Sequence, residues 1–136
     1  MVFLDTNVII YALHNRDEGP SLKSARARNL LAETPGISIQ VANETYHVLN
    51  RKFGQSREKA ALQTRFLIAH THLFDLKLGD LELALDLGQR HQLSHFDALL
   101  VANALNNGAE ILYSEDMHHG LLVEGRLRIL NPFLES

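Results

Sequence analysis

Four acidic residues spread along the chain are the main candidates for chemistry: Asp5, Glu44, Asp97 and Asp116. Carboxylate oxygens are hard ligands that suit Mg²⁺ or Mn²⁺, and the chain has no Cys that would favour a thiolate site. Several carboxylates gathered in one place repel one another unless a cation compensates them. With one or two such ions about 4 Å apart, a water can be deprotonated for in-line attack on a phosphodiester while the leaving oxygen is stabilised.

Each of these acids also has a local structural explanation. Asp5, in M-V-F-L-D-T-N, could cap a following helix, because Asp, Thr and Asn all favour helix starts. Glu44 could compensate the dipole at a helix N-terminus. Asp97 stands three residues after Ser94, as in a capping box, and Asp116 lies in the turn-like sequence S-E-D. These explanations do not predict that all four acids recur at strand ends or helix starts, which a parallel sheet would bring to one edge.

The surroundings of Asp97 make it the strongest candidate of the four. From Phe96 to Leu105 only Asp97 and Asn103 are polar, which predicts a helix that is apolar nearly all round and largely buried. A carboxylate in such a helix is unfavourable unless it is paired or coordinated.

The elements that must position these acids alternate between strand and helix. Apolar patterning predicts strands at residues 2–4, 37–39, 110–114 and 126–130, and a further strand within 70–78. It predicts helices at residues 8–13, 21–33, 41–53, from about 56 onward, 80–91 and 94–107, with a polar loop at 14–19. This alternation over 136 residues predicts an α/β fold with a mainly parallel sheet in one domain, residues 1–136.

Composition and charge exclude several classes of protein. No basic region followed by an apolar segment opens the chain, and no apolar run is long enough for a membrane span, so we expect neither a signal peptide nor a membrane segment. The net charge of −3 argues against binding nucleic acid through bulk positive charge. Residues 1–68, however, carry nine Lys or Arg against six Asp or Glu, so this half could face a polyanion; its basic cluster includes Arg51 and Lys52.

Five segments taken together resemble a PIN domain, in particular the VapC-type toxins of toxin–antitoxin systems. They are D-T-N-V-I-I-Y near the N-terminus, N-E-T-Y, F-D-A-L-L-V-A-N-A, S-E-D-M-H-H-G and the C-terminal R-I-L-N-P-F. The resemblance spans nearly the full chain. It implies a three-layer α/β/α sandwich and a cytoplasmic ribonuclease that depends on Mg²⁺ or Mn²⁺. It also implies a homodimer that is kept inactive by a small antitoxin protein.

The resemblance also assigns roles to residues. It implies that Asp5, Asp97 and Asp116 ligate the metal and that Glu44 acts directly or through a bound water. Three further residues match supporting polar positions of the family: Thr6, Asn7 and Ser114. Because Glu115 is also acidic, the identity of the fourth acid stays open between Glu115 and Asp116.

The resulting hypothesis is a metal-dependent endoribonuclease of toxin type, in which Arg51 and Lys52 hold the RNA backbone that flanks the cleaved bond. One alternative is a phosphatase with an aspartyl-phosphate intermediate, which would need a second Asp two residues after Asp5, where this chain has Asn7. Another alternative is a non-catalytic RNA-binding or protein-interaction module with the same fold. The pairs His118-His119 and His70-x-His72 lack the spacing of a zinc hydrolase, which disfavours zinc chemistry.

Overall fold

One six-stranded sheet, with the first strand of the chain near its middle, organises the structure. A computed structural model describes residues 1–14 and 22–134. The strands follow the spatial order β3-β2-β1-β4-β6-β5. In chain order they are β1 (Val2–Leu4), β2 (Gly36–Ser38), β3 (His72–Phe74), β4 (Ile111–Tyr113), β5 (Leu122–Val123) and β6 (Leu127–Leu130). Neighbouring strands pair in parallel except β5 and β6, which are antiparallel.

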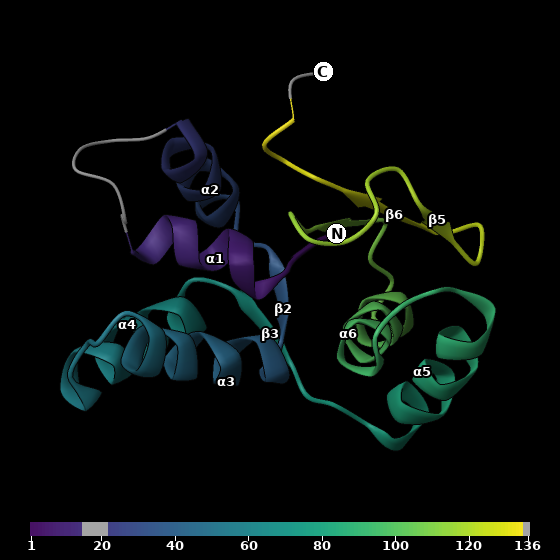
Figure 1. Ribbon diagram of the computed structural model, residues 1–136, viewed down its shortest axis with the longest axis horizontal. Helices are drawn as coiled ribbons and strands as arrows, with labels where there is room; N and C mark the ends of the chain where they lie inside the picture. Colours follow the sequence, from purple (N-terminus) through teal and green to yellow (C-terminus); the bar gives the residue numbers. More distant parts are fainter. Residues whose placement is uncertain (15–21, 135–136) are drawn as a thin grey trace.

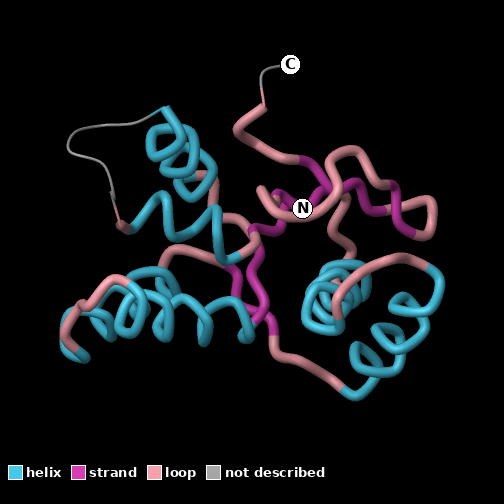
Figure 2. Tube along the Cα trace, in the orientation of Figure 1, coloured by secondary structure: helices cyan, strands magenta, loops and turns pink. Residues whose placement is uncertain are grey.

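Helices cover the sheet on both faces. They are α1 (Thr6–Leu13), α2 (Leu22–Ala32), α3 (Ile39–His47) with the π-helical turn η1 (Val48–Lys52), α4 (Arg57–Ala69), α5 (Leu78–Arg90) and α6 (His95–Asn106). In Figure 1, α5 and α6 lie together on one side of β2 and β3, and α1 to α4 lie on the other. Figure 2 shows the strands as a band between these two groups. The expected three-layer α/β/α sandwich with a mainly parallel sheet is confirmed.

The strand order creates a natural binding position beside β1. From β1 the chain first moves outward to β2 and β3, and then returns to place β4 on the other side of β1. In open α/β sheets, ligands bind outside the carboxyl ends of the strands where the winding reverses in this way. Here that position lies between the ends of β1 and β4.

The core is aliphatic, and helix α6 supplies much of it. Every residue from Leu100 to Leu105 is buried, as the sequence predicts for this helix. The one polar member of that run, Asn103, donates through Nδ2 to the buried carboxylate of Asp80 on α5 at 2.9 Å. Asn106 donates to the same carboxylate at 2.7 Å, so amides from α6 satisfy an acid that α5 contributes to the interface.

Asp80 is buried in the first turn of α5. Its side chain is 2% exposed and also accepts a hydrogen bond from the Lys77 backbone at 3.0 Å. Burial by itself raises the pKa of this carboxyl, but the hydrogen bonds from Asn103, Asn106 and Lys77 outweigh burial, and the net pKa lies below the ordinary value. Asp80 is therefore a stabilised anion that joins α5 to α6.

Most boundaries lie within two residues of those predicted, and the differences have local causes. Helix α1 begins at Thr6 rather than residue 8, because Asp5 caps it. Strand β2 covers residues 36–38 rather than 37–39, because the Ser38 hydroxyl accepts from Gln40 N–H at 3.1 Å and starts α3 there. The predicted helix 41–53 is divided between α3 and η1.

Two further points concern the limits of the elements. The short edge strand β5 (Leu122–Val123) was not predicted, because two residues carry no recognisable alternation. The predicted polar loop 14–19 and the predicted helix start at Ser21 lie outside the described residues, apart from His14.

Among the described helices, none has both the length and the apolar character needed to cross a membrane.

The contact between β1 and β2 leaves no room for a side chain at Gly36. The buried ring of Phe3 stacks on Phe74 with 5.4 Å between centroids, and a Cβ atom at Gly36 would overlap that ring. We predict that Gly36→Ala lowers the free energy of unfolding by about 1–3 kcal/mol. Gly88→Ala, at an exposed helical position with nothing within 4 Å of the added Cβ, should raise it by up to about 1 kcal/mol. Chemical denaturation of both variants measures the two changes, and equal effects would contradict the packing argument.

Candidate functional site

The four predicted acids come from four segments that end or begin at the same edge of the sheet. Asp5 directly follows β1, and Asp116 lies three residues after the end of β4. Glu44 is on α3, which starts immediately after β2. Asp97 is in the first turn of α6; because a short turn joins α6 to β4, the helix runs back along the sheet and its N-terminus lies beside the end of β4.

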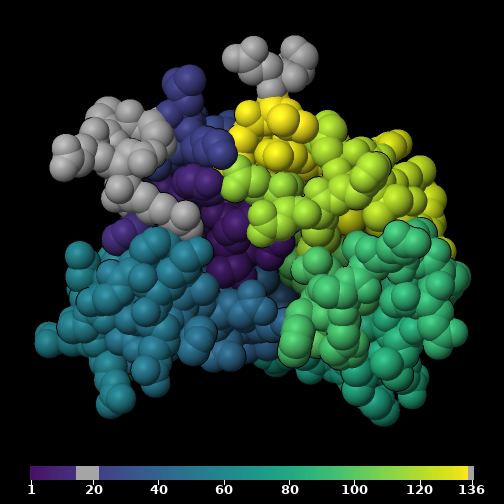
Figure 3. Space-filling model, viewed as in Figure 1, coloured from purple at the N-terminus to yellow at the C-terminus, as the bar shows by residue number. Residues whose placement is uncertain are grey.

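Figure 3 looks directly at this edge. The N-terminal segment, in purple, reaches the surface at the centre of the view. Around it lie the blue segment that includes α3, the lime segment that follows β4 and the green segment at the start of α6. Regions far apart in the sequence thus border one surface position.

Asp5 is both a helix cap and the centre of this site. Its Oδ1 accepts from the Thr6 backbone N–H at 2.7 Å, which is the capping contact that its position predicts. Its Oδ2 accepts from the Ser114 hydroxyl at 2.8 Å, across the parallel pairing of β1 with β4. The Asp5 backbone N–H donates to Tyr113 O at 2.9 Å and extends that pairing by one residue. The capping and site explanations of Asp5 are therefore compatible.

Glu44 is held beside the start of α1 by two polar side chains. The Thr6 hydroxyl donates to Glu44 Oε2 at 2.9 Å, and Gln40 Nε2 donates to Oε1 at 3.1 Å. Sequence reasoning did not single out Gln40. The predicted helix starts at residue 41 and so excludes Gln40. In the observed α3, which starts at Ile39, Gln40 and Glu44 are four residues apart, and side chains at that spacing meet on one helix face.

Asn7 links the first acid to the last. Its Nδ2 donates to Asp116 Oδ2 at 3.0 Å and, at 3.4 Å, to Asp5 Oδ2. Its Oδ1 accepts from the Glu115 backbone N–H at 3.2 Å. The Ser114 hydroxyl also accepts from the Asp116 N–H at 3.3 Å. The turn that follows β4 is thereby fixed to the start of α1.

The structure distinguishes Glu115 from Asp116, which the sequence leaves open. The Glu115 carboxylate accepts from the Tyr11 hydroxyl at 3.0 Å and forms an ion pair with Lys23 Nζ at 2.6 Å. Its negative charge is therefore compensated within the chain. Asp116 is exposed and has its contact on the Asp5 side, through Asn7. Asp116, and not Glu115, joins the acidic group.

Asp97 is half-buried on the first turn of α6. The Ser94 hydroxyl caps the helix by accepting from the Asp97 backbone N–H at 3.2 Å. Burial raises the pKa of the Asp97 carboxyl, a hydrogen bond with Ser94 opposes the rise, and the charges of Asp116 and Glu44 add to it. The four acids are thus close enough to affect one another electrostatically.

The same repulsion acts on Asp5, which is half-buried. The pKa of its carboxyl is raised from the ordinary 3.8 to about 6, with burial as the largest cause. Hydrogen bonds from Ser114 and Thr6 oppose this rise, whereas the charges of Asp97 and Glu44 increase it. Among the described residues, no ion pair involves any of the four acids.

These residues provide a donor set for a divalent cation. Hard carboxylate oxygens without a positive partner are what Mg²⁺ or Mn²⁺ binds, so the chemistry of the set fits such an ion. Within residues 1–14 and 22–134, no three His, Asp or Glu side chains converge tightly enough to form a ready-made ligand shell. Binding would therefore require the carboxylates to draw together.

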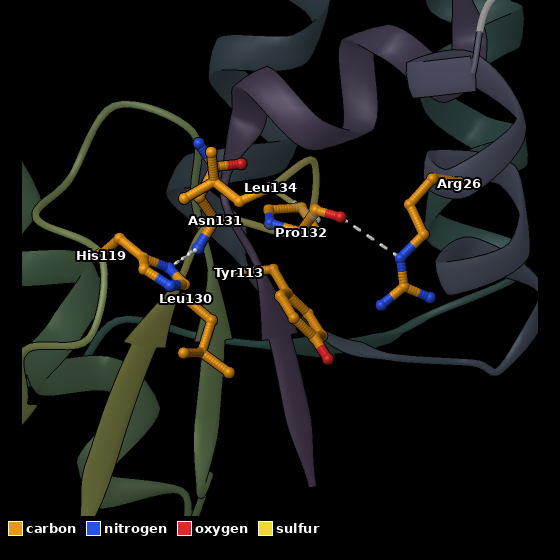
Figure 4. A pocket seen from close by; sticks show the side chains of 7 residues that line it. All are labelled: Arg26, Tyr113, His119, Leu130, Asn131, Pro132 and Leu134. Atoms are coloured by element: carbon orange, nitrogen blue, oxygen red, sulfur yellow. Dashed lines mark hydrogen bonds between the residues drawn. The ribbon is translucent and has the colours of Figure 1, made fainter. Parts of the chain in front are cut away.

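The largest described cavity lies elsewhere. A space of about 670 Å³ is lined in part by the segment that follows β6, and Figure 4 shows the Tyr113 ring directed toward the Arg26 side, with His119 beside Asn131 on the other side. Arg26 Nε donates to Pro132 O at 3.4 Å, and Asn131 N–H donates to His119 Nδ1 at 2.8 Å. None of the four acids lines this cavity, so its size does not identify the site.

A smaller cavity of about 310 Å³ does adjoin the acids. Asp97 and Asp116 line it, together with residues 91–93, residues 117–118 and Leu121. The remaining predicted site residues, Arg51 and Lys52, are exposed on η1. Lys52 Nζ lies 5.7 Å from the Phe53 ring centroid, and the structure gives neither residue a described contact with the acids.

The comparisons with known proteins agree with this fold. The family model described as PIN domain matches residues 2–119, so the chain belongs to the PIN domain family. No curated protein sequence matches it. Among solved structures, the VapC20 toxin of Mycobacterium tuberculosis, described as cleaving the sarcin–ricin loop, has 24% identity and a TM-score of 0.68, over 85% of this chain and 90% of that one.

Two further solved structures cover nearly the whole chain. A toxin–antitoxin complex from Klebsiella pneumoniae has 20% identity and a TM-score of 0.71, over 98% of both chains. A DNA-bound VapBC complex from Salmonella typhimurium has 18% identity and a TM-score of 0.69, over 96% of this chain and 97% of that one. At these identities the likeness concerns the fold.

We predict that the metal-free protein loses stability as the pH rises through about 6. The folded chain holds a proton on Asp5 that the unfolded chain releases near pH 3.8, so the contribution is fully present below pH 3.8 and is lost as Asp5 ionises in the folded state. Asp5→Asn removes this titration. In EDTA, the melting temperature of the variant relative to wild type should rise by several degrees between about pH 4 and pH 7.5. A difference that stays constant with pH would contradict a raised pKa, and Asp75→Asn, at an exposed acid, is the matched control.

Proposed function

We propose that this chain is a metal-dependent endoribonuclease of VapC toxin type, formed by a single domain over residues 1–136. The observation that carries the proposal is the group of four uncompensated acids at the switch point of a PIN fold. An acid kept only for structure is expected to be paired, as Glu115 is with Lys23. Leaving four such groups unpaired in one place is unfavourable unless a cation binds them.

In this proposal Asp5, Asp97 and Asp116 hold Mg²⁺ or Mn²⁺, with Glu44 completing the set directly or through a water. The bound ion would lower the pKa of a coordinated water, so that this water can lose a proton and attack a phosphodiester. Its positive charge would also stabilise the leaving oxygen. Ser114 and Thr6 keep Asp5 ionisable and oriented through the hydrogen bonds at 2.8 and 2.7 Å. Asn7 keeps the loop of Asp116 beside Asp5.

The comparisons support a class of substrate and of partner. VapC20 is described as a toxin that cleaves the sarcin–ricin loop, and another similar structure is a toxin–antitoxin complex. We therefore propose RNA as the substrate, with Arg51 and Lys52 contacting its backbone, and a small antitoxin protein as the partner that silences cleavage. We also propose that the protein acts in the cytoplasm as a homodimer.

Replacing the acids tests the proposed reaction. We expect Asp5→Asn and Asp97→Asn to lower RNA cleavage in Mg²⁺ or Mn²⁺ by more than about 100-fold, because each change removes ligand charge and keeps the side-chain shape. Asp75→Asn should cleave like wild type. Cleavage of a labelled single-stranded RNA, with circular dichroism to verify folding, measures the effect. Wild-type rates in either site variant would overturn the assignment.

Metal binding has a readout that does not need activity. We expect Mn²⁺ to raise the melting temperature of the wild type at pH 7.5, because an ion that binds the folded chain stabilises it by mass action. The rise should disappear in Asp97→Asn and persist in Asp75→Asn. RNA binding without any metal-dependent stabilisation or cleavage would instead favour a non-catalytic module.

The aspartyl-phosphate alternative loses support from the contacts of Asn7. Its amide donates to Asp5 and to Asp116 and so occupies the position where that reaction needs a second, proton-carrying acid. An amide cannot serve as that acid or base.

A further inference from the structure

The cavity beside Asp97 and Asp116 has the composition of a site for a flat, uncharged group. Its apolar lining comes from Leu93, Met117 and Leu121. Its polar edge comes from Gln92 with the imidazoles of His91 and His118. None of the residues that line it is Lys or Arg, so it offers no counter-charge to a second phosphate.

The walls of this cavity are fixed by the same contacts that build the acidic group. The Met117 N–H donates to the Ser114 hydroxyl at 3.4 Å, and that hydroxyl donates to Asp5. The Leu121 carbonyl accepts from Ile129 N–H at 2.9 Å, which attaches the loop to β6. Because these contacts already hold part of the lining in place, a ligand that binds there orders fewer groups.

An ion pair lies close in sequence to the segments that line the cavity. Arg90, the last residue of α5, contacts Glu124 Oε1 through Nη1 at 2.6 Å, between β5 and β6. The segment 91–93 follows Arg90 directly, and residues 117–121 precede β5. The ion pair therefore links the end of α5 to the turn between β5 and β6, the two elements next to these segments.

We infer that this cavity binds the nucleobase of a nucleotide adjoining the cleaved phosphate, and that Gln92 contributes to base preference. The inference rests on the proposed function for the position of the phosphate at Asp97 and Asp116. A volume of about 310 Å³ is at the lower end of the range for small-molecule pockets, about 300–1,000 Å³, which suits one unstacked base with its sugar. The Gln92 amide offers both donors and an acceptor to a base edge.

The first experiment uses nucleosides, which carry no phosphate and need no metal. Adenosine, guanosine, cytidine and uridine are titrated separately into the wild-type protein in EDTA and followed by NMR. At least one should shift the backbone resonances of residues 91–93 and 117–121. Leu121→Trp, which fills the cavity, should abolish these shifts, and Leu122→Trp, at an exposed neighbour outside the cavity, should preserve them.

The second experiment measures base preference on a randomised single-stranded RNA. Gln92→Ala should reduce the preference at one position beside the cut by about tenfold, with the rate on the least favoured base little changed. Gln89→Ala, on α5 and outside the cavity, should keep the wild-type preference. Gln92→Ala is at an exposed position, so it also serves if Leu121→Trp fails to fold.

The two proposals fail in different ways. If no nucleoside shifts these resonances, or if Gln92→Ala leaves base preference intact, the cavity does not bind a base, although loss of cleavage in Asp5→Asn would still support the nuclease. If Asp5→Asn cleaves normally while nucleosides bind in the cavity, the metal site is wrong and the nucleoside site stands.

Discussion

The parallel pairing of β1 with β4 is the constraint on which the site depends, because it brings Asp5 to Ser114 and to the loop that carries Asp116. The pairing places Leu4 opposite Tyr113, so the next residue of each strand meets at the sheet edge. Ser114 then orients Asp5 and also accepts from the loop that carries Asp116. A shift of one residue between these strands would turn every side chain to the other face and separate the two acids.

Asp80 and Asp5 show how the surroundings of a carboxylate distinguish a structural acid from a candidate functional one. Asp80 is almost fully buried, yet its pKa lies below the ordinary value because three donors satisfy it. Asp5 is less buried, yet its pKa is raised because burial and the charges of Asp97 and Glu44 outweigh the hydrogen bonds from Ser114 and Thr6. The unfavourable charge is concentrated at the sheet edge, where a cation can enter from solvent.

The supporting contacts have a common arrangement around this edge. Glu115 faces away from the acids, where Lys23 and Tyr11 neutralise it and attach α2 to the loop after β4. Arg90 at the end of α5 likewise pairs with Glu124 and attaches α5 to the turn between β5 and β6. Ion pairs thus lie at the periphery of the site and fix its loops, while the centre is left without positive charge from the described part of the chain.

Patterning in the sequence was sufficient for the elements that bury a clear apolar face. The strand before Asp5, the buried helix around Asp97 and the alternation of strands with helices are all confirmed, because local periodicity reflects which side chains face the core. The four acids could also be named, since strand ends and helix starts can be recognised along the chain. The division of the predicted helix 41–53 at η1 and the two-residue strand β5 were missed, because neither has a periodicity of its own.

Only the tertiary structure decided how the recognised residues relate to one another. Asp116 and Glu115 are adjacent and chemically alike, and what separates them is Lys23, which is 92 residues away from Glu115 in the chain. Likewise, Asn103 and Asp80 become partners only when α6 packs on α5, and the cavity beside Asp97 exists only between two loops brought together by the sheet. Sequence by itself determined the types of side chain and the elements that carry them. Long-range strand pairing and helix packing determined which charges meet a partner and which do not.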